Sequence, residues 1–379
     1  MHKTISRRKF VASAGMLAAA LPLGARAFDF IPSAGKGFNF ILLGDLHFDK
    51  LEHHDLEYIK VKYKNDLSQI KNYSRITRDN LPLLMQEVKQ KANTGNADFY
   101  LQLGDFVEGL CGSEVLAQKQ TSEFISYIAD QQLGRPFLVI KGNHDITGDG
   151  AIETYNKTVL PWQNNEHKKT VNASNVTFVH KNARFVLFDG YTPHESLPWL
   201  KQVLSDHKEQ LLFFCIHMPV VPFNARSNWH IFAKPAEAKQ REELLNLLGR
   251  HHAIVLCGHL HKTSIVKRTT PAGDFIQVCT GSVVPAPDAA IKDHLLGLDA
   301  YTPDLVNLEA NFAPASLQER KDNLINEKPS IKHFEYADFC GHATVSVTDD
   351  NEAIISLYAN VDKEPWKTIN LTQLLKVNI

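Results

Sequence analysis

The sequence contains few cysteines and no pair of thiols spaced for metal binding. Its five cysteines among 379 residues are an odd number, and no C-x-x-C spacing occurs. This argues against a disulfide framework and against a thiolate metal site. Cys215, Cys257 and Cys279 lie inside apolar runs, where a thiol behaves as a small buried hydrophobic group. We therefore expect reduced, structural cysteines, with at most one bridged pair.

A charge excess of either sign is also missing. The 41 basic and 42 acidic side chains give a formal charge of -1, so no general electrostatic attraction for a nucleic acid exists. Internal repeats and low-complexity tracts do not occur. With 44% hydrophobic residues, the chain is long and apolar enough to bury a large core. The 18 histidines are unusual and direct attention to metal sites.

The first 27 residues are typical of an export signal. Arg7 and Arg8 precede the uncharged stretch 11–23, and residues 25–27 supply an A-R-A cleavage site. The arginine pair is similar to a twin-arginine signal, and the alternative is a plain secretory signal with a chance arginine pair. The uncharged stretch is too short to span a bilayer comfortably. Cleavage would leave 36 basic and 42 acidic side chains, so we expect an exported, periplasmic protein of charge -6 without a membrane span.

Short apolar runs alternate with helical patterns along residues 38–285. The runs are continuous rather than alternating, which indicates strands covered on both faces. They span 38–43, 99–103, 137–140, 184–188, 211–216, 253–257 and 275–279. Between them lie helical patterns, such as the apolar repeat in 81–88 that ends before Gly95. This alternation predicts an α/β fold with mainly parallel connections.

The pattern changes after residue 285. Residues 290–330 contain three prolines and are expected to form an irregular, partly helical connection. Beyond it, 342–347 and 353–358 predict a β-hairpin, to which a third strand is added near 366–371. Because too few residues remain for an independent core, we expect the segment 339–371 to complete a single domain over 28–379.

Five of the apolar runs deliver Asp, Asn or His at their carboxyl ends. These residues are Asp45 and His47, Asp105, Asn143 with His144 and Asp145, His217, and His259 with His261. Open α/β sheets place ligand sites at the carboxyl ends of strands. A glycine precedes four of the clusters and permits a sharp turn there. Each signal alone is weak, but together and in this order they predict a shared site.

In this combination the residues resemble the calcineurin-like metallophosphoesterase superfamily, with motifs from Gly44 to His261. The resemblance implies a four-layer αββα sandwich with a dinuclear metal site at the carboxyl ends of the strands. It also implies ligands: Asp45, His47 and His261 for one ion, Asn143, His217 and His259 for the other, and Asp105 as the bridge. Oxygen and imidazole donors suit Mn, Fe or Zn, so we expect two divalent or trivalent transition-metal ions of unknown identity.

The resemblance further implies hydrolysis of small phosphate monoesters or diesters. A hydroxide held between the two ions would attack phosphorus. His144 would protonate the leaving-group oxygen as general acid. Glu108, three residues after Asp105, is the expected partner of His144. Asp145 is the alternative partner of His144. We expect it instead to support the site without binding a metal ion.

Other functions and substrates stay open on the sequence. A non-catalytic phosphoryl-ligand binding protein is disfavoured because it needs no leaving-group acid, and a nuclease because the mature charge is -6. Resemblances to purple acid phosphatases and to bacterial cyclic-nucleotide phosphodiesterases are comparable. The segment 106–108 lacks the tyrosine that purple enzymes carry after Gly-Asp, which puts a purple iron site in doubt. Monoesters and diesters are therefore equally expected.

Several further residues near the motifs have less definite roles. We expect His53 and His54 in a solvated loop rather than in the cleft. Arg226 and Trp229 follow a predicted ligand and are candidates for substrate contacts, since Arg can grip a phosphate and Trp can cover a leaving group. Asp189 ends a predicted strand, and the resemblance supplies no role for it.

Overall fold

The computed structural model describes residues 35–223, 230–305 and 317–377. The chain divides into the units 1–33 and 34–379, and every strand and helix of the described residues belongs to the second unit. The expected export signal, 1–27, lies outside the described residues, as do Arg226 and Trp229.

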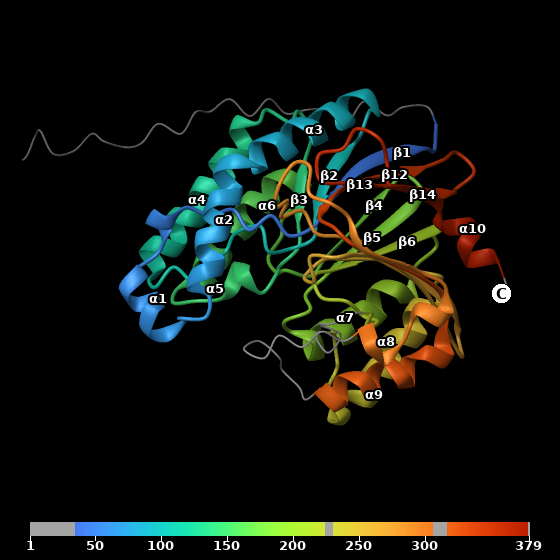
Figure 1. Ribbon diagram of the computed structural model, residues 1–379. Coiled ribbons are helices and arrows are strands. Elements are labelled where there is room, and N and C mark those ends of the chain that lie inside the picture. The colour runs from blue at the N-terminus through green and yellow to red at the C-terminus, as the bar shows by residue number, and fades with distance from the viewer. Residues whose placement is uncertain (1–34, 224–229, 306–316, 378–379) are drawn as a thin grey trace, which may run out of the picture. The chain divides into compact units, whose positions relative to one another are not determined.

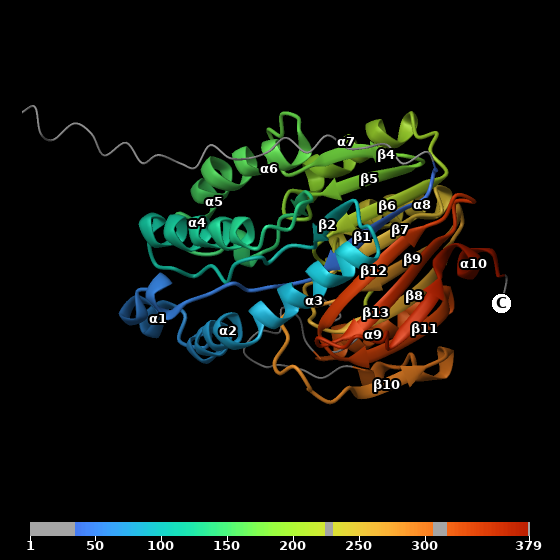
Figure 2. The ribbon, with the colours of Figure 1, turned by 90° about the horizontal axis from the view of Figure 1, so that it is seen from above.

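Two mixed β-sheets pack face to face at the centre of this unit (Figures 1 and 2). The first sheet has the strand order β14-β13-β12-β1-β2-β3. Its strands are β1 (Phe38–Leu43), β2 (Phe99–Gln102), β3 (Phe137–Val139), β12 (Gly341–Val347), β13 (Ala353–Ala359) and β14 (Lys367–Asn370). The expected C-terminal hairpin is β12–β13, and it lies beside β1 through antiparallel pairing.

The second sheet has the strand order β10-β11-β8-β9-β7-β6-β5-β4. Its strands are β4 (Val176–His180), β5 (Ala183–Phe188), β6 (Leu211–Ile216), β7 (Ile254–Cys257), β8 (Thr263–Thr270), β9 (Gly273–Cys279), β10 (Lys292–Leu296) and β11 (Ile331–Asp338). The sequence patterns missed β4, β8, β10 and β11. Polar residues interrupt these four strands, so they do not read as continuous apolar runs.

The expectation of mainly parallel connections over residues 38–285 is confirmed, because all five pairs between the strands predicted there are parallel, but the additional strands make both sheets mixed. Five of the twelve strand pairs in the described residues are parallel: β1–β2, β2–β3, β5–β6, β6–β7 and β7–β9. Short turns join β4 to β5, β8 to β9 and β12 to β13, and a short turn enforces antiparallel pairing. The parallel strands lie at one end of the first sheet, where β3 is the edge strand, and in the inner part of the second sheet, and all five motif-bearing strands are among them.

Helices cover the outer face of each sheet and complete a four-layer α/β sandwich. They are α1 (Leu56–Lys62), α2 (Leu67–Asp79), α3 (Leu81–Thr94), α4 (Glu114–Asp130), α5 (Ala151–Thr154), α6 (Leu160–His167), α7 (Pro193–Ser205), α8 (Ala238–Arg250) and α9 (Leu317–Glu327). The last helix, α10 (Leu371–Lys376), instead packs its Leu371 into the core between the sheets. Leu84 of α3 and Phe124 of α4 pack on the first sheet. Leu200 of α7 and Leu248 of α8 pack on the second. No helix in the described part of the chain has the length and apolar character that a bilayer crossing requires.

The main core lies between the two sheets. Phe40 and Phe99 of the first sheet stack on each other, and both meet Phe185 of the second sheet edge to face. Burial of such side chains stabilises the fold by about 1.5–3 kcal/mol each. The five cysteines are buried and none forms a disulfide, which confirms the expectation of reduced, structural thiols.

Candidate metal centre

The loops that follow β1, β2, β3, β6 and β7 bring the predicted ligands together. Three groups of side chains have ligand atoms that lie within 4.8 Å of one another. They are Asp45–His47–His261, His47–Asp105–His144 and Asp105–His217–His259. Asn143 lines the same cavity as His144 and His259. Residues that are up to 216 positions apart in sequence thus meet where the parallel strands of both sheets end.

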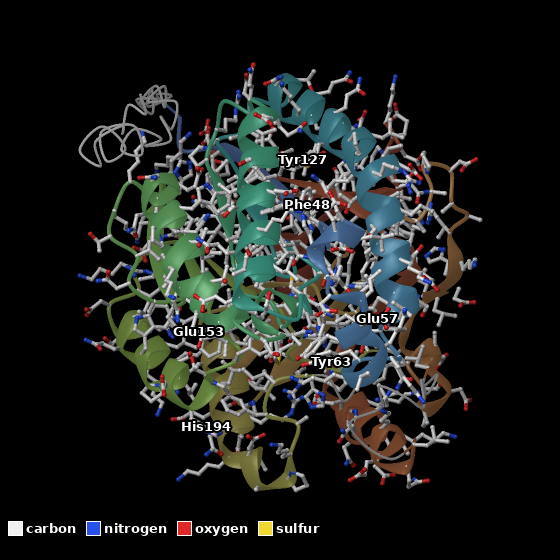
Figure 3. All side chains as sticks on the ribbon, turned by 90° about the vertical axis from the view of Figure 1, so that its left-hand side faces the viewer. Phe48, Glu57, Tyr63, Tyr127, Glu153 and His194 are labelled. Atoms are coloured by element: carbon white, nitrogen blue, oxygen red, sulfur yellow. The ribbon has the colours of Figure 1, made fainter. Side chains whose placement is uncertain are left out.

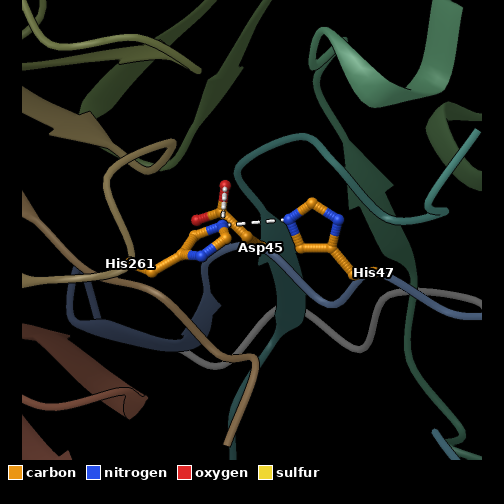
Figure 4. A group of neighbouring side chains, drawn as sticks. All are labelled: Asp45, His47 and His261. Atoms are coloured by element: carbon orange, nitrogen blue, oxygen red, sulfur yellow. Dashed lines mark hydrogen bonds and ion pairs between the residues drawn. The ribbon is translucent and has the colours of Figure 1, made fainter. Parts of the chain in front are cut away.

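Asp45, His47 and His261 form the first group (Figure 4). Nε2 of His47 lies 2.9 Å from Nε2 of His261, and Oδ1 of Asp45 lies 3.5 Å from the same His261 nitrogen. With one proton shared between the two nitrogens this contact is a hydrogen bond, and with that proton removed both nitrogens can direct a lone pair at the same ion. A metal ion is the partner that satisfies two imidazoles and a carboxylate in this way.

Asp105, His217 and His259 form the second group. Nε2 of His217 lies 3.0 Å from Oδ2 of Asp105 and 3.1 Å from Nδ1 of His259. The same Oδ2 atom of Asp105 lies 3.9 Å from Nε2 of His47 in the first group. The Asp105 carboxylate therefore lies between the two groups, which is the place that a bridging ligand needs.

The surroundings favour the metal-binding forms of Asp105 and His259. In contrast, Asp105 and Asp45 outweigh burial and raise the pKa of His217 to about 10, so His217 must release a proton when it binds metal. Burial opposes ionisation of Asp105, but His217 and His144 outweigh it and hold its pKa well below the ordinary value. Burial and the neighbouring His217 place the pKa of His259 well below its ordinary value. An ionised carboxylate and a neutral imidazole are the forms that bind metal. The residues present thus fit two divalent transition-metal ions.

Four of the expected ligands have left-handed backbone conformations. The φ angles are 46° at His47, 54° at Asp105, 73° at His259 and 52° at His261. Non-glycine residues adopt this region rarely and at a cost, and such residues gather at functional sites. The sequence does not predict this strain, because it arises only where the loops converge in the folded chain.

The preceding glycines serve two different purposes. Gly104 has a φ of 90°, so it makes the sharp turn that was expected. Gly142 has no such φ, but a Cβ there would lie 2.1 Å from the main-chain nitrogen of Asp105. The loop after β3 therefore needs glycine for close approach to the loop after β2, and not for the turn itself.

Glu108 occupies a different place from the one expected. Its carboxylate oxygen Oε2 lies 2.7 Å from Nδ1 of His47, and burial raises the pKa of Glu108 to about 8. The main-chain carbonyl of Glu108 accepts a hydrogen bond from Nδ1 of His144 at 2.7 Å, whereas the carboxylate lies 3.4 Å from that nitrogen. The side chain thus orients a ligand of the first group, and the main chain orients His144.

Asp145 holds the loops together. Its carboxylate accepts hydrogen bonds from the main-chain N–H groups of Asp105, Phe106, Val107 and Gly142 at 2.7–3.3 Å. These contacts fix the loop after β2 against the loop after β3. Asp145 is therefore placed to support the site, and the carbonyl of Glu108 is the partner of His144.

His53 and His54 are buried, so the expectation of a solvated loop is wrong. His53 ends a short 3₁₀ helix, Leu51–His53, and its Nε2 lies 3.0 Å from the carboxylate of Glu123 on α4. Nε2 of His54 lies 2.7 Å from Oδ1 of the buried Asp49. Pairing with Glu123, 70 residues away, and with Asp49, five residues away, offsets the cost of burying these two imidazoles. Neither histidine lines the cavity of the metal centre.

Two tyrosines that the sequence analysis missed contact the ligands. The ring of Tyr73 on α2 stacks on His47, with centroids 4.3 Å apart. The hydroxyl of Tyr191 donates a hydrogen bond to Oδ1 of Asn143 at 3.2 Å. Burial and nearby carboxylates raise the pKa of Tyr191 well above its ordinary value, so its hydroxyl stays protonated. Tyr191 follows an apolar strand just as the ligands do, and this position could have drawn attention to it.

A cavity of about 670 Å³ opens onto the centre. Its inner wall includes Asp105, Asn143 and His144, and its outer wall is the segment 61–69 that ends α1 and begins α2. Tyr63 of this segment is labelled in Figure 3, below the helices that cover that face. A second cavity, lined by Phe48 and Tyr127 higher on the same face, contains none of the expected ligands.

Comparison with known proteins shows the family. The family model for calcineurin-like phosphoesterases matches residues 38–263. A probable cyclic nucleotide phosphodiesterase of Moraxella catarrhalis (strain BBH18) is 24% identical over 242 residues, covering 59% of this chain and 72% of that protein. A manganese-dependent ADP-ribose/CDP-alcohol diphosphatase of Arabidopsis thaliana is 23% identical over 239 residues, covering 50% of this chain and 72% of that protein.

A solved structure shares the fold. A purple acid phosphatase from yellow lupin (Lupinus luteus) seeds superposes with a TM-score of 0.51 at 12% identity, covering 88% of this chain and 53% of that one. The family match includes every loop that contributes a ligand to the candidate metal centre. It does not include the C-terminal strands β12, β13 and β14, which complete the first sheet. The chain therefore belongs to the calcineurin-like phosphoesterase family and is a metal-dependent phosphoric ester hydrolase.

Proposed function

We propose that the protein hydrolyses small phosphate diesters in preference to monoesters. The charge of the cavity wall carries this proposal. Among the described residues that line the cavity, Lys62 and Lys64 alone have fixed positive charge, and both are exposed on the outer wall. A monoester dianion gains more than a diester monoanion from fixed cations at the phosphoryl group. The described part of the wall has no inner lysine or arginine and therefore suits the diester better.

The names of the two relatives support the same choice. One is a probable cyclic nucleotide phosphodiesterase and the other is an ADP-ribose/CDP-alcohol diphosphatase. Both names describe substrates in which the attacked phosphorus carries substituents on two sides. A cavity of about 670 Å³ has room for such a second substituent, since small-molecule sites generally span about 300–1,000 Å³.

The roles of the residues follow from their contacts. When bound, two metal ions would supply positive charge to the phosphoryl oxygens and a water of lowered pKa. Asp105, between the two groups, would hold both ions. The bond from Nδ1 of His144 to the carbonyl of Glu108 leaves Nε2 as the nitrogen that can give a proton to the leaving oxygen. General acid catalysis of this kind contributes about 10²–10⁴-fold.

The test is metal analysis combined with a substrate panel. Protein purified without chelator is analysed for Mn, Fe and Zn, then assayed with added Mn²⁺, because one relative is manganese-dependent. The panel contains bis(4-nitrophenyl) phosphate, 4-nitrophenyl phosphate, a cyclic nucleotide and ADP-ribose. We expect kcat/KM for diesters to exceed that for the monoester. The reverse order would make the protein a monoesterase, and binding without turnover over hours would make it a phosphoryl-ligand binder.

Export is the second part of the proposal. Residues 1–27 would direct the chain through a twin-arginine route to the periplasm, which suits a metalloprotein because that route carries folded proteins. The double variant Arg7→Lys, Arg8→Lys keeps the charge and removes the arginine pair. Cell fractionation should find this variant retained inside the cell. Unchanged export would instead indicate a plain secretory signal. The matched control is Lys9→Arg, which exchanges a neighbouring basic residue, keeps the arginine pair and should be exported normally.

A further inference from the structure

We propose that Tyr191 is a positioning residue that holds Asn143 in the orientation needed to bind metal in the second group. The Tyr191 hydroxyl lies 3.2 Å from Oδ1 of Asn143. The ring of Tyr191 lies beside His217, with centroids 6.3 Å apart. One side chain therefore contacts two of the ligands expected for this group. The proposal rests on the metal centre and is independent of which ester is hydrolysed.

The chemistry of the amide explains why such a contact matters. A side-chain amide binds a metal ion through its oxygen, and this oxygen has two lone pairs. The Tyr191 hydroxyl takes one lone pair, and the other stays available for an ion. Rotation of the amide by half a turn would replace the oxygen with an NH₂ group, which cannot bind metal. A carboxylate presents an oxygen in either orientation, so Asn143 needs an orienting partner in a way that Asp45 and Asp105 do not.

The two loops that carry Tyr191 and Asn143 are fixed to each other by an ion pair. Lys141, two residues before Asn143, forms a close ion pair with Asp189, two residues before Tyr191, and the two side chains are 12% and 5% exposed. Oδ1 of Asp189 also accepts a hydrogen bond from the main-chain N–H of Tyr191 at 2.9 Å. Asp189, which had no role in the sequence analysis, thereby sets the position of Tyr191.

The loop after β5 is itself anchored. The main-chain N–H of Asp189 donates to Oδ1 of Asn175 at 2.8 Å, and Nδ2 of Asn175 donates to the hydroxyl of Ser196 at 2.8 Å. Ser196 lies at the start of α7 and is buried. Tyr191 is therefore held by the sheet and by α7, and it approaches Asn143 from a rigid support rather than from a loose loop.

The direct test is Tyr191→Phe, which removes the hydroxyl and keeps the ring. Mn²⁺ is titrated into metal-free protein by calorimetry and by electron paramagnetic resonance, which separates single ions from exchange-coupled pairs. We expect one of the two ions to bind about 10-fold more weakly. The signal of the coupled pair should be lost at two equivalents and restored by excess Mn²⁺, and kcat should recover in parallel while KM stays unchanged.

Tyr301→Phe is the matched control. Tyr301 is buried among the side chains that pack on the outer face of the second sheet, and its hydroxyl donates to the main-chain carbonyl of Pro222 at 2.6 Å, so the hydroxyl that is lost there bonds to no expected ligand. This variant should bind both ions as the unmodified protein does. Two-ion binding by Tyr191→Phe that equals the control would overturn the proposal, and so would a native protein that binds fewer than two ions.

Asp189→Asn gives a second reading if Tyr191→Phe fails to fold, as judged by thermal melting. This substitution removes the charge that pairs with Lys141 but does not alter the Tyr191 side chain itself. We expect a smaller loss of affinity for the same ion, again restored by excess Mn²⁺. An unchanged titration in this variant would contradict the part assigned to the ion pair. Because neither titration uses a substrate, the result stands apart from whether the diester preference is correct.

Discussion

The carboxylate of Glu108 lies 2.7 Å from Nδ1 of His47, and both side chains are buried. A carboxylate on the far nitrogen of a ligand histidine fixes the tautomer and makes the other nitrogen a stronger ligand. Glu108 orients His47 in this way through Nδ1. The main-chain carbonyl of Leu103 orients His217 in the same way, because it accepts a hydrogen bond from Nδ1 of His217 at 2.7 Å. Each half of the centre therefore has its own orienting acceptor.

Glu108→Gln should weaken metal binding in the first group without changing the chemistry of the leaving group. The amide keeps an acceptor for His47 but loses the charge that Glu108 carries above its pKa of about 8, so we expect metal affinity above that pH to fall about 10-fold or more. Calorimetric titration with Mn²⁺ measures this change. The sensitivity of kcat to the leaving group should stay as in the native protein, because His144 bonds to the main chain. A new dependence on leaving-group pKa would mean that the carboxylate acts on His144 after all.

His144→Ala should lower turnover in proportion to how poor the leaving group is. Aliphatic diesters need a proton on the leaving oxygen, whereas nitrophenolate leaves readily without one. We expect a loss of about 10²–10⁴-fold for the aliphatic diester and a much smaller loss for bis(4-nitrophenyl) phosphate. Steady-state kinetics on both esters at saturating Mn²⁺ provides the comparison. Equal losses on both would remove the general-acid role.

Asp105→Asn should abolish activity and reduce metal content together. The Asp105 carboxylate lies 3.0 Å from His217 and 3.9 Å from His47 through the same oxygen, so one substitution affects both groups. Elemental analysis after dialysis should find fewer than two ions per chain. Full occupancy by two ions would show that the carboxylate does not bridge them.

Asp145→Ala should destabilise the protein strongly. It leaves four buried main-chain N–H groups without their acceptor, and each such loss costs about 1–3 kcal/mol. We expect the free energy of unfolding in urea to fall by at least about 3 kcal/mol. Asp145→Asn keeps one acceptor oxygen, so it should lower the free energy of unfolding by less than the alanine variant does. If alanine were tolerated with full stability but without activity, Asp145 would act in the reaction itself.

His342 should make the fold sensitive to acid. It is buried beside Tyr358, and burial lowers its pKa to about 3 from 6.5. The unfolded chain then binds this proton at a higher pH than the folded chain, so stability is lost as the pH falls from about 6.5 towards 3. His342→Phe should reduce the slope of unfolding free energy against pH in that range by up to about 1.4 kcal/mol per pH unit. An unchanged slope would contradict the assignment.

Residue type and order along the chain were enough to predict the central strands and a shared site at their ends, and the resemblance to the family then implied the ligands. Continuous apolar runs placed β1 at its observed bounds and β2, β3, β5, β6, β7 and β9 within two residues of theirs, because a strand buried on both faces excludes polar residues. The polar residues at the ends of these runs are those that the structure brings together. Local pattern sufficed here, since the carboxyl ends of parallel strands meet at one edge of a sheet.

Which residue orients which ligand depends instead on the folded arrangement of the loops. Glu108 contacts His47 rather than chiefly His144, and His53 and His54 are buried against acidic partners. Tyr191 reaches Asn143 from a loop 48 residues away. Such contacts depend on how two loops lie across a gap of a few ångströms, and no local pattern encodes that distance. The strained φ angles of the ligands have the same origin, since they arise only when the loops converge.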